Sequence, residues 1–233
     1  MRPFRSVLAF ILLFLSGSAM AQMAFEQPNE QVSGERLFDT CIFCHGLEAQ
    51  GNDRRDGPAL AGLPTWYIEL QMKNFRDGIR GTHPEDVPGK VMHFTRGLMR
   101  DDGHIARVAE YISGLETGLP MAANAVGARP YIWDSPYAGL DPSIEGNVAA
   151  GQQTYSTTCT VCHGADGVGN EALGAADLRY LSEIYMTRQL MYFRDGVRGT
   201  HPQDIRGAQM AVMSKMLTTD QAIADVVAYI QTL

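Results

Sequence analysis

The sequence predicts an all-α protein built from two tandem domains, and three observations support this fold class. A shift of 118 residues superposes the second half of the chain on the first, which identifies an internal repeat. No segment alternates apolar and polar residues as a half-buried strand does. Near the end of each repeat, apolar residues recur at positions i, i+3, i+4 and i+7, the pattern of an amphipathic helix. These residues are Ile105, Val108, Ala109 and Ile112, and then Ile223, Val226, Val227 and Ile230.

The repeat also sets the domain boundaries. Residues 75–84 and 193–202 differ only by the exchange of Ile79 for Val197, and the register holds to the closing helices. Each repeat is near the lower size limit for an independent hydrophobic core, so a bound group that fills part of the interior would help it fold. We expect a signal peptide over residues 1–21, a first domain over 22–118, a linker over 119–147 and a second domain over 148–233.

The N-terminus has the three regions of a secretory signal peptide. Arg2 and Arg5 precede an apolar run over residues 7–15, and Ala19-Met20-Ala21 supplies a small-residue cleavage site. The alternative is an uncleaved membrane anchor, but the run is shorter than the roughly 20 apolar residues that cross a bilayer. We therefore expect export, in a bacterium to the periplasm, and no transmembrane segment in the mature chain.

The first element of each domain is predicted to be a short helix that leads into a cysteine motif. It covers residues 35–40 in the first repeat and 152–158 in the second. We expect Gly34 and Gly151 to open these helices. A glycine-rich loop follows each cysteine motif, where turns rather than regular structure are expected.

A middle helix and a closing helix complete each domain. Residues 66–77 and 183–195 carry apolar side chains at rough helical spacing, which predicts the middle helix. Asp102 and Asp220 precede the apolar stripe of the closing helix, where an N-terminal cap or a first-turn acid stabilises a helix.

The segment between the repeats is predicted to be a connector without regular structure. Residues 119–147 contain four prolines and several glycines. Such a segment is longer than most loops of a compact domain, so we do not expect a purely solvated tether. We predict that its aromatic side chains, Tyr131, Trp133 and Tyr137, pack against one or both domains.

All four cysteines lie in two Cys-x-x-Cys-His motifs, the signature of c-type haem attachment. Two thiols at this spacing can bond the two vinyl groups of one haem, and the adjoining histidine then ligates the iron. A zinc site or a thioredoxin-like redox pair also uses Cys-x-x-Cys, but neither requires a histidine next to the motif in both copies. The motifs predict two covalently bound haem c groups at Cys41, Cys44 and His45, and at Cys159, Cys162 and His163.

The sixth iron ligand decides whether such a haem carries electrons or binds a substrate. Met92 and Met210 occupy equivalent repeat positions, each in what we expect to be a loop before the closing helix. His83 and His201 are also equivalent and form a rival pair. Methionine ligation would raise the reduction potential relative to two histidines, and either ligand would leave no site for oxygen or peroxide.

Two further repeated features concern the surroundings of the haems. Arg80 and Arg198 either pair with haem propionates, since a guanidinium binds a carboxylate well, or are solvated surface residues. The carbonyl of Pro58 is a candidate acceptor for the Nδ1 proton of His45. Because the second repeat has Ala176 at that position, we expect His163 to use another acceptor.

The charge of the chain restricts its partners. The full sequence has a formal charge of −7, and without the signal peptide 17 basic and 26 acidic residues leave −9. Such an acidic balance argues against nucleic acid binding. It favours association with partners that present positive charge.

Taken together, these motifs resemble those of the dihaem cytochrome c4 family and, more broadly, tandem class I cytochromes c. The resemblance covers nearly the whole mature sequence and rests on both Cys-x-x-Cys-His motifs, on Gly57-Pro58-Ala59-Leu60 and on the Phe-Arg-Asp-Gly-x-Arg segments. It implies two all-α domains, each around one haem, with methionine as sixth ligand, which favours Met92 and Met210 over the histidines. It also implies electron transfer in a respiratory chain, from a quinol-oxidising complex or a dehydrogenase to a terminal oxidase or reductase.

On this basis we expect an electron-transfer protein and not an enzyme. One alternative is a dihaem subunit of a catalytic complex, such as a flavocytochrome c sulfide dehydrogenase. Another is a dihaem enzyme, such as a peroxidase or a thiosulfate-oxidising protein, which would need an open position on one iron.

Overall fold

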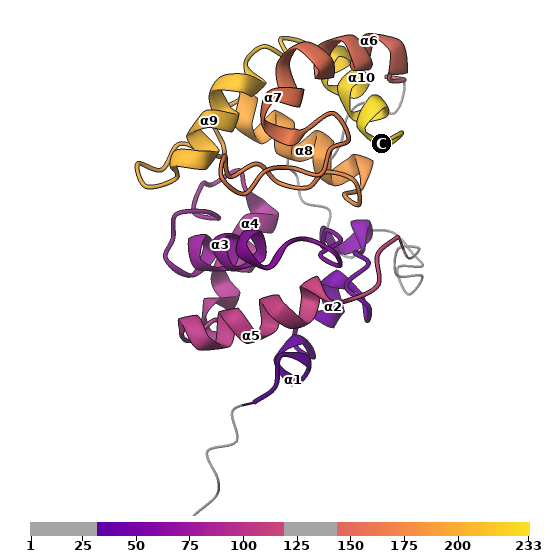
Figure 1. Cartoon of the computed structure of the whole chain (residues 1–233). Coiled ribbons are helices and arrows are strands. Elements are labelled where there is room, and N and C mark those ends of the chain that lie inside the picture. Colours follow the sequence, from indigo (N-terminus) through magenta and orange to yellow (C-terminus); the bar gives the residue numbers. More distant parts are fainter. Residues whose placement is uncertain (1–31, 119–143) are drawn as a thin grey trace, which may run out of the picture. The chain divides into compact units, whose positions relative to one another are not determined.

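The closing helices of the two repeats lie where the sequence predicts them. A computed structural model describes residues 32–118 and 144–233. These are helix α5 (Asp102–Ser113) and helix α10 (Asp220–Ile230), labelled in Figure 1. Each buries its apolar stripe. The capping residues lie just before each helix. The side chain of Asp101 accepts a hydrogen bond from the backbone amide of His104, and the side chain of Thr219 accepts one from the amide of Ala222. Asp102 and Asp220 are therefore first-turn acids.

The middle helices are also confirmed, to within one residue at their ends, as α3 (Thr65–Arg76) and α8 (Glu183–Arg194). Short helices α2 (Ile42–His45) and α7 (Thr160–His163) carry the cysteine motifs. Short 3-10 turns lie at η1 (Asp53–Arg55) and η2 (Thr95–Leu98). Within residues 32–118 and 144–233, β pairing is limited to two isolated and equivalent bridges, so the all-α prediction is confirmed.

Two helices were expected as loops. Helix α4 (Val87–Phe94) and helix α9 (Ile205–Ser214) follow the repeated Gly-Thr-His-Pro segments. Asp86 caps α4 by accepting from the amide of Gly89 at 2.9 Å, and Asp204 caps α9 in the same way. The proline and glycine in the first turn of α4 resemble loop residues, although proline is well tolerated there.

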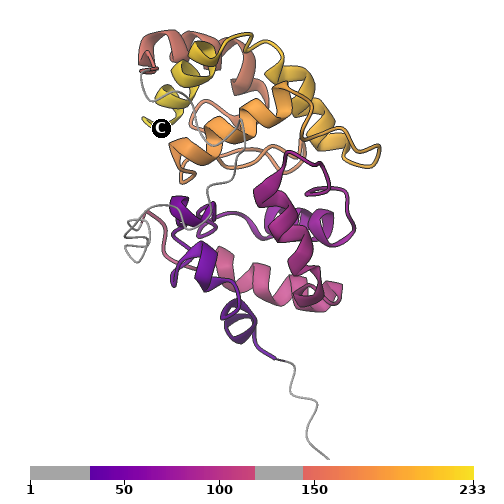
Figure 2. The same ribbon diagram turned by 180° about the vertical axis from the view of Figure 1, so that it is seen from behind.

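The first helices differ from the prediction in their extent. Helix α1 covers Gly34–Phe38, whereas helix α6 covers Val148–Thr154 and continues as a π-helical turn, η3 (Tyr155–Cys159). Gly151 therefore lies inside α6 rather than at its start. Helix α6 packs across α10, as both views show (Figures 1 and 2). A β-carbon at Gly151 would lie 1.9 Å from the carbonyl oxygen of Asp225 in α10, so the glycine permits this close approach.

We expect Gly151→Ala to destabilise the second domain by about 1–3 kcal/mol, because the added methyl must force the two helices apart. For a domain of this size the Tm should fall by on the order of 10 °C. Thermal unfolding followed by circular dichroism measures the effect. Gly97→Ala is the control, because a β-carbon at Gly97 has no neighbour within 4 Å. Equal losses of Tm in Gly151→Ala and Gly97→Ala would contradict this explanation of how α6 packs across α10.

Both repeats belong to one compact unit, Ser33–Leu233. Each contributes its own apolar core, centred on Phe38, Ile68 and Ile112 in the first and on Tyr155, Tyr192 and Ile223 in the second. The predicted signal peptide and the predicted packing of Tyr131, Trp133 and Tyr137 lie outside the described residues. Among the helices of residues 32–118 and 144–233, none is both long and apolar enough to cross a bilayer.

Candidate haem sites

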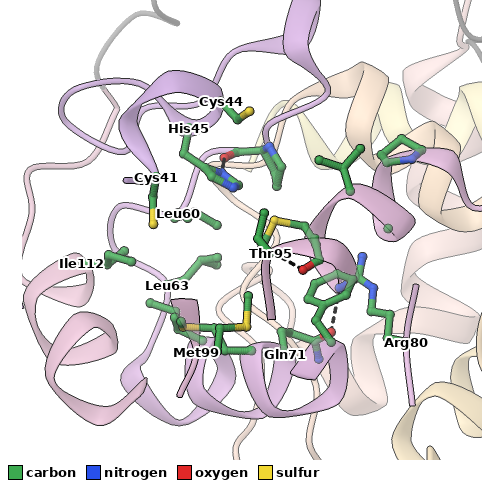
Figure 3. A pocket seen from close by; sticks show the side chains of 18 of the residues that line it. Cys41, Cys44, His45, Leu60, Leu63, Gln71, Arg80, Thr95, Met99 and Ile112 are labelled. Atoms are coloured by element: carbon green, nitrogen blue, oxygen red, sulfur yellow. Dashed lines mark hydrogen bonds between the residues drawn. The ribbon is translucent and has the colours of Figure 1, made fainter. Parts of the chain in front are cut away.

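The first cysteine motif opens onto an apolar cavity. Cys41, Cys44 and His45 line one side of it, and the ring of His45 points inward from α2 (Figure 3). Leu63 and Ile112 belong to its apolar wall. The cavity thus presents two thiols and the imidazole of His45 on a mainly apolar wall, which is the environment that a covalently held porphyrin requires.

His45 is held in the orientation of a metal ligand. Its Nδ1 donates to the carbonyl oxygen of Pro58 at 2.9 Å, which leaves Nε2 as the free lone pair on the cavity side. Burial lowers the pKa of His45, and the hydrogen bond to Pro58 opposes this only in part. The ring is therefore neutral at pH 7, as iron ligation requires.

The second motif repeats this arrangement in a cavity lined by Cys159, Cys162 and His163. The Nδ1 of His163 donates to the carbonyl oxygen of Ala176, also at 2.9 Å. The expectation that His163 would use another acceptor is wrong, because the acceptor is a backbone oxygen that alanine presents as well as proline does. The two proximal histidines therefore have matching hydrogen-bond partners.

Met92 and Met210 line the same cavities as the proximal histidines, from equivalent turns of α4 and α9. They lie on helices and not on loops, so that expectation is corrected. Met99 also lines the first cavity, but its equivalent in the second is Leu217. The rival pair, His83 and His201, lines neither haem cavity.

The two repeated histidines instead line a separate cavity where the two Gly-Thr-His-Pro loops meet. In each loop the Nδ1 of the histidine accepts from a backbone amide two residues later, His83 from Glu85 and His201 from Gln203, both at 3.2 Å. These bonds hold the loops in the same conformation in both domains. The structure thus gives the histidines a role in loop geometry.

Arg80 and Arg198 are buried, each only 8 % exposed, so the surface alternative is wrong. They form a ring of four residues with Gln71 and Gln189, here called the Gln–Arg ring. Each glutamine Oε1 accepts from the arginine of its own domain, at 2.7 and 2.6 Å, and from the arginine of the other domain, at 3.0 and 3.1 Å. The guanidiniums also lie over Phe75 and Phe193, each 4.5 Å from the ring centroid.

The Nε atoms of Arg80, Arg188 and Arg198 are buried and have no hydrogen-bond partner among the described residues. Buried cations require anionic or hydrogen-bonding partners, so three such groups beside two cavities indicate negatively charged ligands there. All three arginines line one or the other cavity. The carboxylate-bearing edge of a haem fits this requirement, and the residues present therefore fit the cofactor.

The thiols do not resemble those of a redox pair. Burial raises the pKa of Cys41 and of Cys44, and it raises the pKa of Cys159 to about 11. A thioredoxin-like pair needs a thiol whose pKa is lowered. In residues 32–118 and 144–233, no group of three or more histidine, cysteine or acidic side chains is placed to hold a metal ion such as zinc.

Tandem helical domains with one such cavity each define a class of dihaem electron-transfer proteins. A family model for cytochrome c matches residues 31–116 and 148–233. Cytochrome c4 of Pseudomonas aeruginosa is 29% identical over 230 residues, which cover 97% of this chain and 98% of that protein. The chain belongs to the cytochrome c family as a dihaem, c4-like member, and it carries two covalently bound haem c groups.

Two further relatives are informative. A protein of Thiomonas intermedia named thiosulfate dehydrogenase electron acceptor is 39% identical over 205 residues, covering 86% of this chain and 80% of that one. The crystal structure of reduced cytochrome c4 from Pseudomonas stutzeri matches with a TM-score of 0.59 at 21% identity, over 86% of this chain and 96% of that chain. The structural match supports the fold.

Some residues of the site were not found by sequence reasoning. Gln71 and Gln189 line both cavities, as do the repeated Tyr67 and Tyr185, for which the sequence leaves two roles open, at the haem edge or as anchors of the middle helix. Their repetition at equivalent positions is visible in the sequence. Repetition alone, however, does not show that each side chain lines the cavity of the other domain as well as that of its own. Arg188 has no arginine at the equivalent position and gave no signal.

Proposed function

We propose that the protein is a periplasmic electron carrier that accepts electrons from a dehydrogenase and passes them to a terminal oxidase or reductase. The observation that carries this proposal is the equivalent pair Met92 and Met210, each in the same cavity as a proximal histidine. A histidine and a methionine together would fill both axial positions of each iron. A site completed in this way exchanges electrons and binds no substrate.

The proposal assigns the following roles. The thiols of Cys41, Cys44, Cys159 and Cys162 form the thioether bonds, His45 and His163 are the proximal ligands, and Met92 and Met210 are the distal ligands. Each haem, when bound, supplies a one-electron couple between ferrous and ferric iron. The chain supplies the orientation of the histidines through Pro58 and Ala176, and the apolar walls exclude water.

Exposure of the attachment edges supports exchange with protein partners. Phe43 and Val161, which lie between the cysteines of the two motifs, are 63% and 77% exposed. Electrons therefore need to cross little protein at these edges. The formal charge of −9 without the signal peptide favours partners with a basic docking face.

The name of the Thiomonas relative suggests the electron donor. We propose a sulfur-oxidising dehydrogenase, in the first instance a thiosulfate dehydrogenase. The test mixes the ferric protein with a purified thiosulfate dehydrogenase and thiosulfate and follows reduction of the haem absorption bands. Rapid reduction of both haems, dependent on enzyme and on thiosulfate, is expected. Reduction by quinol-oxidising membranes but not by the dehydrogenase would overturn this choice of donor, and stable copurification with a second polypeptide would indicate a complex subunit instead.

A further inference from the structure

We propose that Arg188, from the second domain, is a positioning residue that sets the reduction potential of the haem in the first domain. This inference rests on the proposed function, since it concerns the bound haem. The basis is one ion pair between the two domains, which gives the first site a buried charge pair that the second lacks.

The contact is short and buried. Arg188 Nη1 lies 2.6 Å from Asp56 Oδ1, and the two side chains are 4% and 5% exposed. A second bond supports it, because the hydroxyl of Ser182, in the turn before α8, donates to Asp53 at 2.6 Å. The first turn of the second domain's middle helix is thus fixed to the loop that follows the first cysteine motif.

Asp56 occupies a backbone conformation that disfavours its side chain. Its φ of 56° and ψ of 20° lie in the left-handed region, which glycine adopts freely and aspartate only at a steric cost. The equivalent residue of the second repeat is Gly174, which adopts φ 70° without that cost. A carboxylate is therefore held at this position of the first domain only, at a conformational cost that its ion pair offsets.

The arrangement has no counterpart around the second cavity. The residue equivalent to Arg188 is Leu70, which lines the second cavity with its hydrocarbon side chain. The additional arginine of that cavity, Arg206, comes from the second domain itself and is exposed. The first cavity thus receives a buried cation from the other domain, and the second does not.

Both members of the pair line the first cavity, and the buried Nε of Arg188 has no hydrogen-bond partner in residues 32–118 and 144–233. A positive charge beside a haem favours its reduced state, because reduction removes one positive charge from the iron. Removing the cation should therefore lower the potential of the first haem, and removing the anion should raise it. The effect of a buried charge is not screened as a surface charge is.

The test is a spectroscopic redox titration of the intact dihaem protein and of Arg188→Leu and Asp56→Gly, which place the residues of the other repeat. The first haem is identified by NMR contacts between its methyl groups and Ile68 of its cavity. We expect opposite shifts of the first haem, down for Arg188→Leu and up for Asp56→Gly. Each should change the electron-exchange equilibrium between the haems about tenfold, or about 59 mV for a one-electron couple. The second haem should not move.

Arg194→Leu is the control, because it removes a cation from the end of the same helix, where Arg194 pairs with Asp195 and Asp220. It should leave both potentials in place. If both test variants lower thermal stability but leave the first potential unchanged, or shift it in the same direction, Arg188 only docks the domains and the inference is wrong. A wild-type protein that does not titrate as two one-electron haems would instead contradict the proposed function.

Discussion

Met92→Leu is expected to remove the sulfur ligand from the first haem. The weak near-infrared band of methionine-ligated ferric haem should lose about half its intensity, since the second haem keeps Met210. The reduced first haem should bind carbon monoxide, which the wild type should not. Its reduction potential should fall by on the order of 0.1 V or more, within the range of about 0.8 V that axial ligands span.

Met99→Leu is the matched control, because Met99 lines the same cavity and its equivalent in the second domain is already leucine, Leu217. It should retain the full near-infrared band and exclude carbon monoxide. Met210→Leu should reproduce the Met92→Leu result at the second haem. If Met99→Leu lost the band and Met92→Leu kept it, the assignment of Met92 as the ligand would be wrong. The first site would then use a methionine that has no equivalent in the second.

Gln189→Leu is expected to cause the largest loss of stability among single changes in the Gln–Arg ring. The amide oxygen of Gln189 accepts from Arg198 at 2.6 Å and from Arg80 at 3.1 Å, and the residue is 9 % exposed. Hydrogen bonds to charged groups contribute about 1.5–3 kcal/mol each. The buried Nη1 of Arg198 would lose its 2.6 Å acceptor, whereas Nη2 of Arg80 would keep a 3.3 Å bond to the hydroxyl of Tyr185. The free energy of unfolding should fall by about 3 kcal/mol or more, and the Tm by on the order of 10 °C.

Thermal unfolding of the holoprotein, followed by circular dichroism and by the haem absorption bands, measures this effect. Gln153→Leu is the control, since Gln153 is exposed on α6 and should change the Tm little. Because each ring glutamine serves both domains, Gln189→Leu should shift unfolding of the first domain as well as the second. A loss confined to the second domain would contradict the crossed arrangement.

The cysteine motifs and the closing helices were predictable because each is encoded locally. A Cys-x-x-Cys-His pentapeptide carries its own chemistry, and the apolar stripe that ends in Ile112 or Ile230 needs only its helical period. Helices α4 and α9 were missed because their first turns contain residues that are typical of loops. Pro88 and Gly89 resemble loop residues, although Asp86, whose side chain accepts from the amide of Gly89, is of a residue type that caps helices.

The contacts that join the domains were not predictable from the sequence. Arg188 and Asp56 are 132 residues apart, and neither belongs to a repeated pattern. The glutamines and arginines of the ring are repeated, but the repeat shows only that the two domains share them. Whether a side chain forms its hydrogen bond within its own domain or to the other domain depends on how the two domains pack. That packing is set by burial between residues that are far apart in the sequence. The acceptor of His163 was mispredicted because the accepting atom is the backbone carbonyl oxygen of Ala176, and a backbone carbonyl is present whether that residue is alanine or proline.

The central claim is that this polypeptide holds two haems through four thioether bonds. Mass spectrometry of the protein, denatured after export in cells with a working haem-attachment system, tests it most directly. The account predicts the polypeptide mass plus two haem groups, with one haem lost in a variant carrying Cys41→Ala and Cys44→Ala and the other retained. A mass equal to that of the bare polypeptide would contradict the account.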